Sequence, residues 1–159
     1  IRFDTTVGAG NPIELSGGFY FARSYIQGVS AKYIPLVDTV GALAYGVYTP
    51  TRSAEANMTG NASMTEAQYT RVGNTVTVSG RFTATATLAA TTTSVEITLP
   101  VASNIGAVED VAGVAFCGNI AAMGAEIVGV VANDTAKIQW KSSDITSQTW
   151  SYIFQYQVI

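Results

Sequence analysis

The feature that most constrains the fold is a strict alternation of apolar and polar side chains between Thr75 and Leu88. Successive side chains of an extended strand point to opposite faces, so this alternation predicts a strand with one buried face and one solvated face. Gly80 lies within the run and is predicted to form a bulge or a bend. The predicted inward face carries Val76, Val78, Phe82, Ala84, Ala86 and Leu88.

The same two-residue period recurs along the chain, whereas helix signals are scarce. The best helix candidate, Ala54–Met64, is rich in asparagine, threonine, serine and glycine, which are poor helix formers. Alternation predicts further half-buried strands over Ser94–Leu99, Ala136–Lys141 and Trp150–Ile159. Their predicted inward residues are Val95, Ile97 and Leu99, then Ala136, Ile138 and Trp140, and finally Trp150, Tyr152, Phe154, Tyr156 and Val158.

Two short polar segments predict hairpin turns. Gly73-Asn74 follows the run Gln68–Val72 and suits the positive-φ positions of a two-residue hairpin loop. Asn133-Asp134 separates two apolar segments, and both residue types tolerate left-handed backbone. Antiparallel pairing of neighbouring strands is therefore the expected arrangement.

Two segments carry apolar residues in succession instead of alternating. Val111–Phe116 and Glu126–Val131 are predicted to be strands covered on both faces. Cys117, the one cysteine of the chain, follows the first of these runs and is predicted to be a small buried hydrophobic residue.

These patterns predict an all-β chain whose N-terminal segment differs in pattern from the domain that follows. About eight strands follow Tyr45 at intervals typical of an antiparallel β-sandwich, jelly roll or barrel, so residues 45–159 are expected to form one domain. Residues 1–44 contain short apolar triplets between glycine-rich breaks at irregular spacings. They are predicted to form a lead-in segment, either the last rungs of a parallel β-helix or an arm wrapped around a trimer.

The charge content narrows the possible partners. Only 12% of residues are charged, about half the usual share, which is typical of a β-protein with a Thr- and Ser-rich surface or of one covered by sister chains. The net charge is -3, and the eight basic residues are scattered singly, so nucleic-acid binding is not expected. No apolar run reaches the length of a membrane helix, and membrane insertion is not expected.

The inventory of reactive residues argues against catalysis and metal binding. The chain has no histidine and one cysteine, which excludes a Ser-His-Asp, a Cys-His or a zinc site within it. Glu109-Asp110 and the pair Asp134 with Asp144 are the candidates for a glycosidase pair. The side chains of adjacent strand residues point to opposite faces, so Glu109-Asp110 is predicted to lie in a solvated loop. Asn133-Asp134 is predicted to be a turn and not a calcium-binding loop. Gly8-Ala9-Gly10 lacks the following helix of a phosphate loop. We expect no enzyme activity and no cofactor.

Aromatic residues are the remaining candidates for a binding surface. Trp140 and Trp150 lie in phase with apolar neighbours, so they are predicted to lie in the core or in a subunit interface, and not on a glycan-binding platform. Four tyrosines in less regular segments stay open as contact residues, and the sequence assigns none of them a receptor: Tyr20, Tyr25, Tyr33 and Tyr48.

Four segments carry a resemblance to a known family. In order, Tyr48–Thr51, Gln68–Gly80, Thr98–Pro100 and Phe154–Ile159 resemble the C-terminal domain of tailed-bacteriophage tail-fibre, tailspike and virion-decorating proteins. The resemblance covers residues 45–159. It implies a homotrimeric β-sandwich that ends a virion appendage, holds three chains in register and contacts bacterial surface polysaccharide. It implies no catalytic residue.

The resulting hypothesis is a structural and attachment module of a phage virion, with other virion proteins as neighbours. Two alternatives stay open. A capsid decoration protein of the same fold would clamp coat subunits, and a monomeric carbohydrate-binding module would display an exposed aromatic strip on one sheet. A hydrolytic tailspike would need a catalytic part before Ile1.

Overall fold

The computed structural model describes residues 43–159 except 59 and 61, and these residues form an antiparallel β-structure. The predicted lead-in over residues 1–44 lies outside the described residues, apart from Leu43 and Ala44, which begin the first strand. The described strands are β1 (Leu43–Tyr48), β2 (Arg52–Ala56), β3 (Ser63–Met64), β4 (Ala67–Val72), β5 (Thr75–Thr85), β6 (Thr92–Ile97), β7 (Val111–Cys117), β8 (Gly124–Val130), β9 (Thr135–Lys141) and β10 (Ser147–Gln157), with the 3₁₀ helix η1 at Val108–Asp110.

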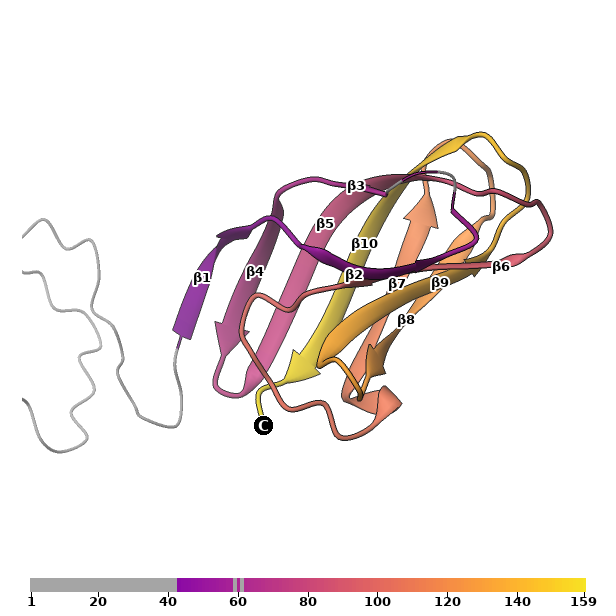
Figure 1. Cartoon of the computed structure of the whole chain (residues 1–159). Helices are drawn as coiled ribbons and strands as arrows, with labels where there is room; N and C mark the ends of the chain where they lie inside the picture. Colours follow the sequence, from indigo (N-terminus) through magenta and orange to yellow (C-terminus); the bar gives the residue numbers. More distant parts are fainter. Residues whose placement is uncertain (1–42, 59, 61) are drawn as a thin grey trace, which may run out of the picture. The chain divides into compact units, whose positions relative to one another are not determined.

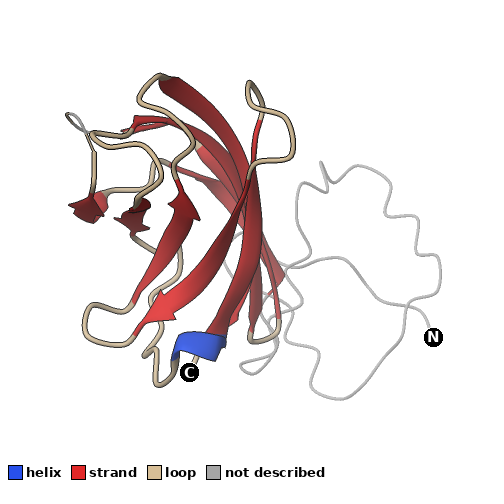
Figure 2. Ribbon diagram, turned by 90° about the vertical axis from the view of Figure 1, so that its right-hand side faces the viewer, coloured by secondary structure: helices blue, strands red, loops and turns tan. Residues whose placement is uncertain are grey.

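All ten strands belong to one hydrogen-bonded sheet (Figure 1). Its order is β1-β4-β5-β10-β7-β8-β9-β6-β2, and β3 pairs with β5 beside this path. The sheet curls so that strands from its two halves face each other (Figure 2). The antiparallel all-β prediction is confirmed, and the two facing layers are parts of one continuous sheet.

The core lies between these layers and is built around aromatic rings. Trp140 of β9 packs against Trp150 of β10, with ring centroids 4.9 Å apart, and against Phe82 of β5, at 6.0 Å. Trp150 and Phe82 are fully buried, and Trp140 nearly so. The predicted core position of both tryptophans is therefore confirmed.

Strand β5 shows how the alternation determines which residues are buried. Its predicted inward residues are buried through Ala86, but Leu88 lies beyond the strand and is exposed. The bulge predicted at Gly80 is absent from the pairing with β10, where Gly80 pairs in register with Tyr152. On the other side of β5, the register with β3 and β4 shifts by one residue opposite Gly80. A Cβ atom at Gly80 would lie 2.5 Å from the Tyr152 hydroxyl oxygen, so glycine makes room for this side chain.

Both predicted hairpins are present. Strands β4 and β5 pair through Val72 and Thr75, and Gly73 adopts a φ of 61°, the left-handed region that glycine enters without penalty. Strands β8 and β9 pair through Val130 and Thr135, and Asp134 in the intervening turn has a φ of 53°.

The prediction that β7 and β8 are covered on both faces is wrong. Residues of β7 alternate between buried and exposed, and Val114 and Phe116 point to the solvated face. On β8, Glu126 shares that face. Cys117 packs against the core but is only half-buried, with its thiol 3.2 Å from the Asn119 side-chain oxygen. Runs of apolar residues therefore mark an exposed apolar surface in this chain.

Strand β10 occupies the centre of the sheet, between β5 and β7. Its inward residues Trp150, Tyr152, Phe154 and Tyr156 are buried as predicted, and Val158 is half-buried beyond the strand. Four buried side-chain polar atoms of the core have no hydrogen-bond partner among the described residues: Trp140 Nε1, Gln148 Oε1, Trp150 Nε1 and the Tyr152 hydroxyl.

Candidate interaction surfaces

The carboxylates beside η1 stabilise a loop. The side-chain oxygen of Asp110 accepts hydrogen bonds from the backbone N–H groups of Gly106 and Ala107, at 2.8 and 2.9 Å. Asp134 accepts one from the N–H of Ile105, at 2.8 Å. Glu109 is exposed in η1, so the loop predicted at Glu109-Asp110 is a short 3₁₀ turn. Asp110 and Asp134 therefore hold the segment that leads into β7.

The second candidate glycosidase pair is not brought together. Asp134 precedes β9 and Asp144 follows it, so the seven residues of this strand separate them. At about 3.3 Å per residue the separation is roughly 23 Å, well beyond the distance that two cooperating carboxylates span. Asp144 accepts hydrogen bonds from the backbone and hydroxyl groups of Thr146, which lower its pKa. Its geometry is that of a turn.

The part of the chain that the structure describes contains no group of three or more residues arranged to hold a metal ion. It also contains no helix that is long and apolar enough to cross a membrane.

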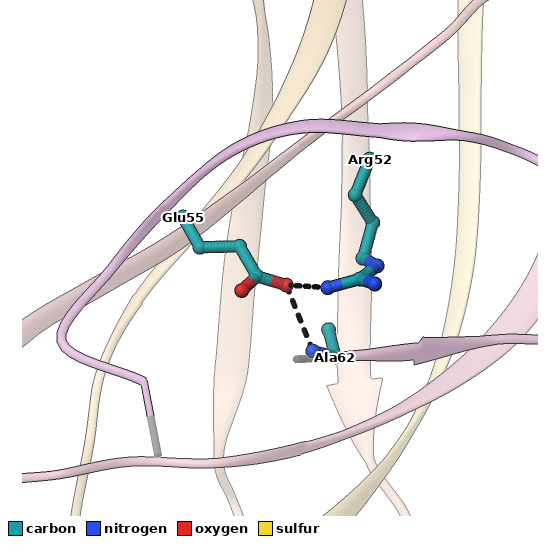
Figure 3. Close-up of polar contacts among 3 residues, drawn as sticks. All are labelled: Arg52, Glu55 and Ala62. Atoms are coloured by element: carbon teal, nitrogen blue, oxygen red, sulfur yellow. Dashed lines mark hydrogen bonds and ion pairs between the residues drawn. The ribbon is translucent and has the colours of Figure 1, made fainter. Parts of the chain in front are cut away.

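An open groove of about 510 Å³ lies beside β2 and β3. Its lining combines hydroxyl groups, the Arg52 side chain and a few apolar atoms, and consists of Thr49, Pro50, Thr51, Arg52, Ala62, Ser63 and Met64. The Glu55 carboxylate forms an ion pair with Arg52, with N and O 2.7 Å apart, and accepts a hydrogen bond from the backbone N–H of Ala62 at 2.8 Å (Figure 3). Glu55 thus connects the two sides of the segment between β2 and β3.

A bulge brings this pair of charges together. Residues three apart on a regular strand point to opposite faces, but Arg52 pairs with Ile97 of β6 while Glu55 pairs with Val95. Three steps on β2 therefore match two steps on β6, and the extra residue turns both side chains to the same side. Sequence reasoning missed the contact because this segment carries no strand alternation that would reveal a bulge.

A second groove, of about 530 Å³, follows β1 and β4. It is lined by Tyr45, Gly46, Val47, Gln68, Tyr69 and Thr70. Tyr48, one of the tyrosines left open by the sequence, lies on the inward face of β1, and its hydroxyl donates a hydrogen bond to the Thr98 carbonyl across the fold. Tyr48 therefore holds the edge of the sheet. Tyr20, Tyr25 and Tyr33 lie outside the described residues.

The outer face of β7 and β10 carries an apolar strip. We define the outer strip as Val114, Phe116 and Ile153, whose residues are 44%, 63% and 48% exposed. Val114 and Ile153 are directly paired across β7 and β10, and Phe116 is paired with the small residue Ser151. Contiguous exposed apolar side chains of this kind are typical of contact surfaces.

Comparison with protein-family models, curated proteins and solved structures gives no match. The resemblance of residues 45–159 to phage appendage domains therefore stays a prediction.

The surfaces differ in chemistry from a typical glycan platform. Trp140 and Trp150 are buried, and the exposed aromatic residues among those described are Tyr45 and Phe116, which lie on different strands, β1 and β7. The polar groove at Arg52 and the outer strip were not found from the sequence. The apolar run Val111–Phe116 was the available signal for Val114 and Phe116 of the outer strip.

Proposed function

We propose that this chain is a non-enzymatic structural and attachment module of a bacteriophage virion appendage, a tail fibre or tailspike. In this role it assembles as a homotrimer and contacts other virion proteins and bacterial surface polysaccharide. The structural observation that carries the assembly part of this proposal is the outer strip, because Phe116 and Ile153 lie exposed at the centre of a sheet in a chain of low charge. Such a surface is suited to being covered by another chain.

The family resemblance supports the same function. Its longest segment, Gln68–Gly80, spans the β4–β5 hairpin, and its last segment, Phe154–Ile159, includes the end of the central strand β10. Both contribute to one half of the sheet, where β4, β5 and β10 are neighbours. The resemblance thus involves residues that build the core and not only a loop.

The polar groove is the proposed contact for glycan. Arg52 and the hydroxyl groups of Thr49, Thr51 and Ser63 provide hydrogen-bond donors and acceptors at an open surface. Sugar hydroxyls are recognised by such groups. Replacing Ser63 with Tyr would fill the groove, and we expect it to abolish binding to host polysaccharide, while Asn74→Tyr in the exposed β4–β5 turn would leave binding unchanged.

The first experiment is the solution mass of the 159-residue chain by light scattering after size exclusion. We expect three times the 16.6 kDa of one chain. A mass of 16.6 kDa at all concentrations would contradict the assembly function and favour a monomeric binding module.

Labelling of intact particles separates the tail from the head. We expect an antibody against this chain to label virion tails. Label on the capsid would instead identify a decoration protein, and release of sugar by the chain itself would contradict the non-enzymatic assignment.

A further inference from the structure

The strand registers place the outer strip between two opposite charges. On the outer face, one level across the sheet reads Arg81, Ser151, Phe116 and Gly124, on β5, β10, β7 and β8. The neighbouring level reads Ser79, Ile153, Val114 and Glu126 on the same strands. Arg81 therefore flanks the apolar residues on the β5 side, and Glu126 flanks them on the β8 side.

Both charges are available for an external partner. Arg81 and Glu126 are exposed, and the one ion pair among the described residues is Arg52 with Glu55. The Glu126 carboxylate accepts a hydrogen bond from the Gln139 side chain at 3.3 Å, which leaves its charge unneutralised.

This order of residues is self-complementary under a rotation axis that runs parallel to the strands. Such an axis brings the β5/β10 half of one copy against the β7/β8 half of the next, level with level. Phe116 then meets the small Ser151 of the neighbouring copy, and Ile153 meets Val114. An axis across the strands would instead bring Arg81 toward Arg81, and like charges would repel.

The charges also come within reach of each other. Arg81 of one copy faces Gly124 of the next, and Glu126 lies two residues farther along that strand. Two residues of a strand span about 6.6 Å, a distance that the long arginine side chain crosses over a glycine.

We propose that copies of this chain associate through the outer strip, with Arg81 of one copy paired with Glu126 of the next. This inference rests on the proposed assembly function and identifies its interface. Stable interfaces bury roughly 1,200–2,000 Å² in total, whereas three partly exposed apolar side chains supply on the order of a few hundred. The outer strip alone is therefore too small for a stable interface. The charged residues that flank it extend the contact and set its register.

Charge reversal tests the pairing in the 159-residue chain. We expect Arg81→Glu and Glu126→Arg each to raise the dissociation constant of the assembly at least about tenfold, because like charges then face each other. The double variant restores the opposite signs and is expected to return within about threefold of the wild type. The measurement is native mass spectrometry over a concentration series.

Two controls complete the experiment. Lys141→Glu, an exposed charge reversal on β9 with the same change in net charge as Arg81→Glu, is expected to leave association unchanged. Circular dichroism checks that every variant is folded.

The outcomes separate the interface from the assembly function. A wild-type chain that stays monomeric would overturn both. A wild-type assembly that either single reversal leaves intact, or that the double variant does not restore, would overturn this interface alone.

Discussion

Two buried tyrosines of β10 differ in how their hydroxyl groups are satisfied. The Tyr156 hydroxyl donates to the Val101 carbonyl at 2.7 Å and accepts from the Val101 N–H at 3.0 Å, which fixes the loop after β6 to the core. The Tyr152 hydroxyl is buried without a hydrogen-bond partner among the described residues. The two side chains are similarly buried, but their hydroxyl groups therefore contribute differently to stability.

Removing these hydroxyl groups should show the difference. We expect Tyr156→Phe to lower the free energy of unfolding by about 1–3 kcal/mol, because two partly buried backbone groups of Val101 lose their partner. Tyr152→Phe is the matched control and is expected to stay within about 0.5 kcal/mol of the wild type. Urea unfolding followed by tryptophan fluorescence measures both. Equal losses would contradict this reading of the hydrogen bonds.

The glycines of the sheet provide a second test at this scale. A Cβ at Gly113 would lie 2.4 Å from the Ile153 carbonyl oxygen and even closer to the Phe154 Cβ, whereas one at Gly80 meets chiefly the end of the Tyr152 side chain. Backbone atoms cannot move aside as readily as the end of an aromatic side chain. We expect Gly80→Ala to cost about 1–3 kcal/mol and Gly113→Ala to cost more.

Gly118→Ala is the control for this series, because its Cβ would meet its nearest atom, the Thr149 carbonyl oxygen, at 3.6 Å. Its urea midpoint should stay close to that of the wild type. The idea of close backbone approach at Gly113 fails if Gly113→Ala is as stable as Gly118→Ala.

At the scale of elements, the β2 edge depends on one carboxylate. Glu55 bonds both Arg52 and the N–H of Ala62, and the bulge in β2 makes both bonds possible. Ala62 belongs to the core, so this contact links an edge strand to the interior. Its loss should loosen one segment without unfolding the sheet.

We expect Glu55→Ala to speed hydrogen exchange of the Ala62 amide at least about tenfold, the equivalent of about 1.4 kcal/mol for one lost charged hydrogen bond. Glu55→Gln keeps an acceptor oxygen and should have a smaller effect. Glu66→Ala, an exposed carboxylate between β3 and β4, is the control. Unchanged exchange in Glu55→Ala would show that the segment is held by other contacts.

The sequence predicts elements well where one face is buried. Alternation from Val76 to Ala86 identified the inward face of β5, and Gly73-Asn74 identified its hairpin, because both signals are local. Val114 and Phe116 could not be placed from sequence alone, since a run of apolar residues fits a strand covered on both faces as well as an exposed contact surface. Only pairing with β10, far along the chain, determines their face.

The candidate sites were less predictable than the fold. Arg52 and Glu55 meet through a bulge, and Arg81 and Glu126 flank the outer strip through three successive strand pairings. None of these relations leaves a pattern in a short stretch of sequence. The sequence did correctly place Trp140 and Trp150, whose burial follows from the phase of their own strands.

At the scale of the whole molecule, three buried or partly buried tyrosines make the stability of the fold depend on pH in the alkaline range. Burial raises the pKa of Tyr48 and Tyr152 well above the usual value, and it raises the pKa of Tyr156 to about 12 despite its bond to Val101. The folded state therefore favours the neutral phenol. This stabilisation is complete below the unfolded pKa of about 10 and declines as pH rises above it.

We expect these three of the eight tyrosines to ionise only as the protein unfolds in alkali. The phenolate absorbance of these three tyrosines should thus appear only with loss of the circular dichroism signal. Full ionisation of every tyrosine in a chain that still gives the native signal would refute this. Tyr156→Phe should reduce the absorbance change that accompanies unfolding by one phenolate.

The position of β10 also has a consequence for biosynthesis. Strands β5 and β7 each pair with β10, and the side chains of Thr77 and Gln155, 78 residues apart, are hydrogen-bonded across that pairing. A ribosome synthesises the described strands β1–β9 before β10, the strand that joins the two halves of the sheet. Until translation passes Gln157, two partial sheets display open edges to neighbouring nascent chains. Polysomes that synthesise several copies side by side would then bring these open edges together before any copy has finished folding.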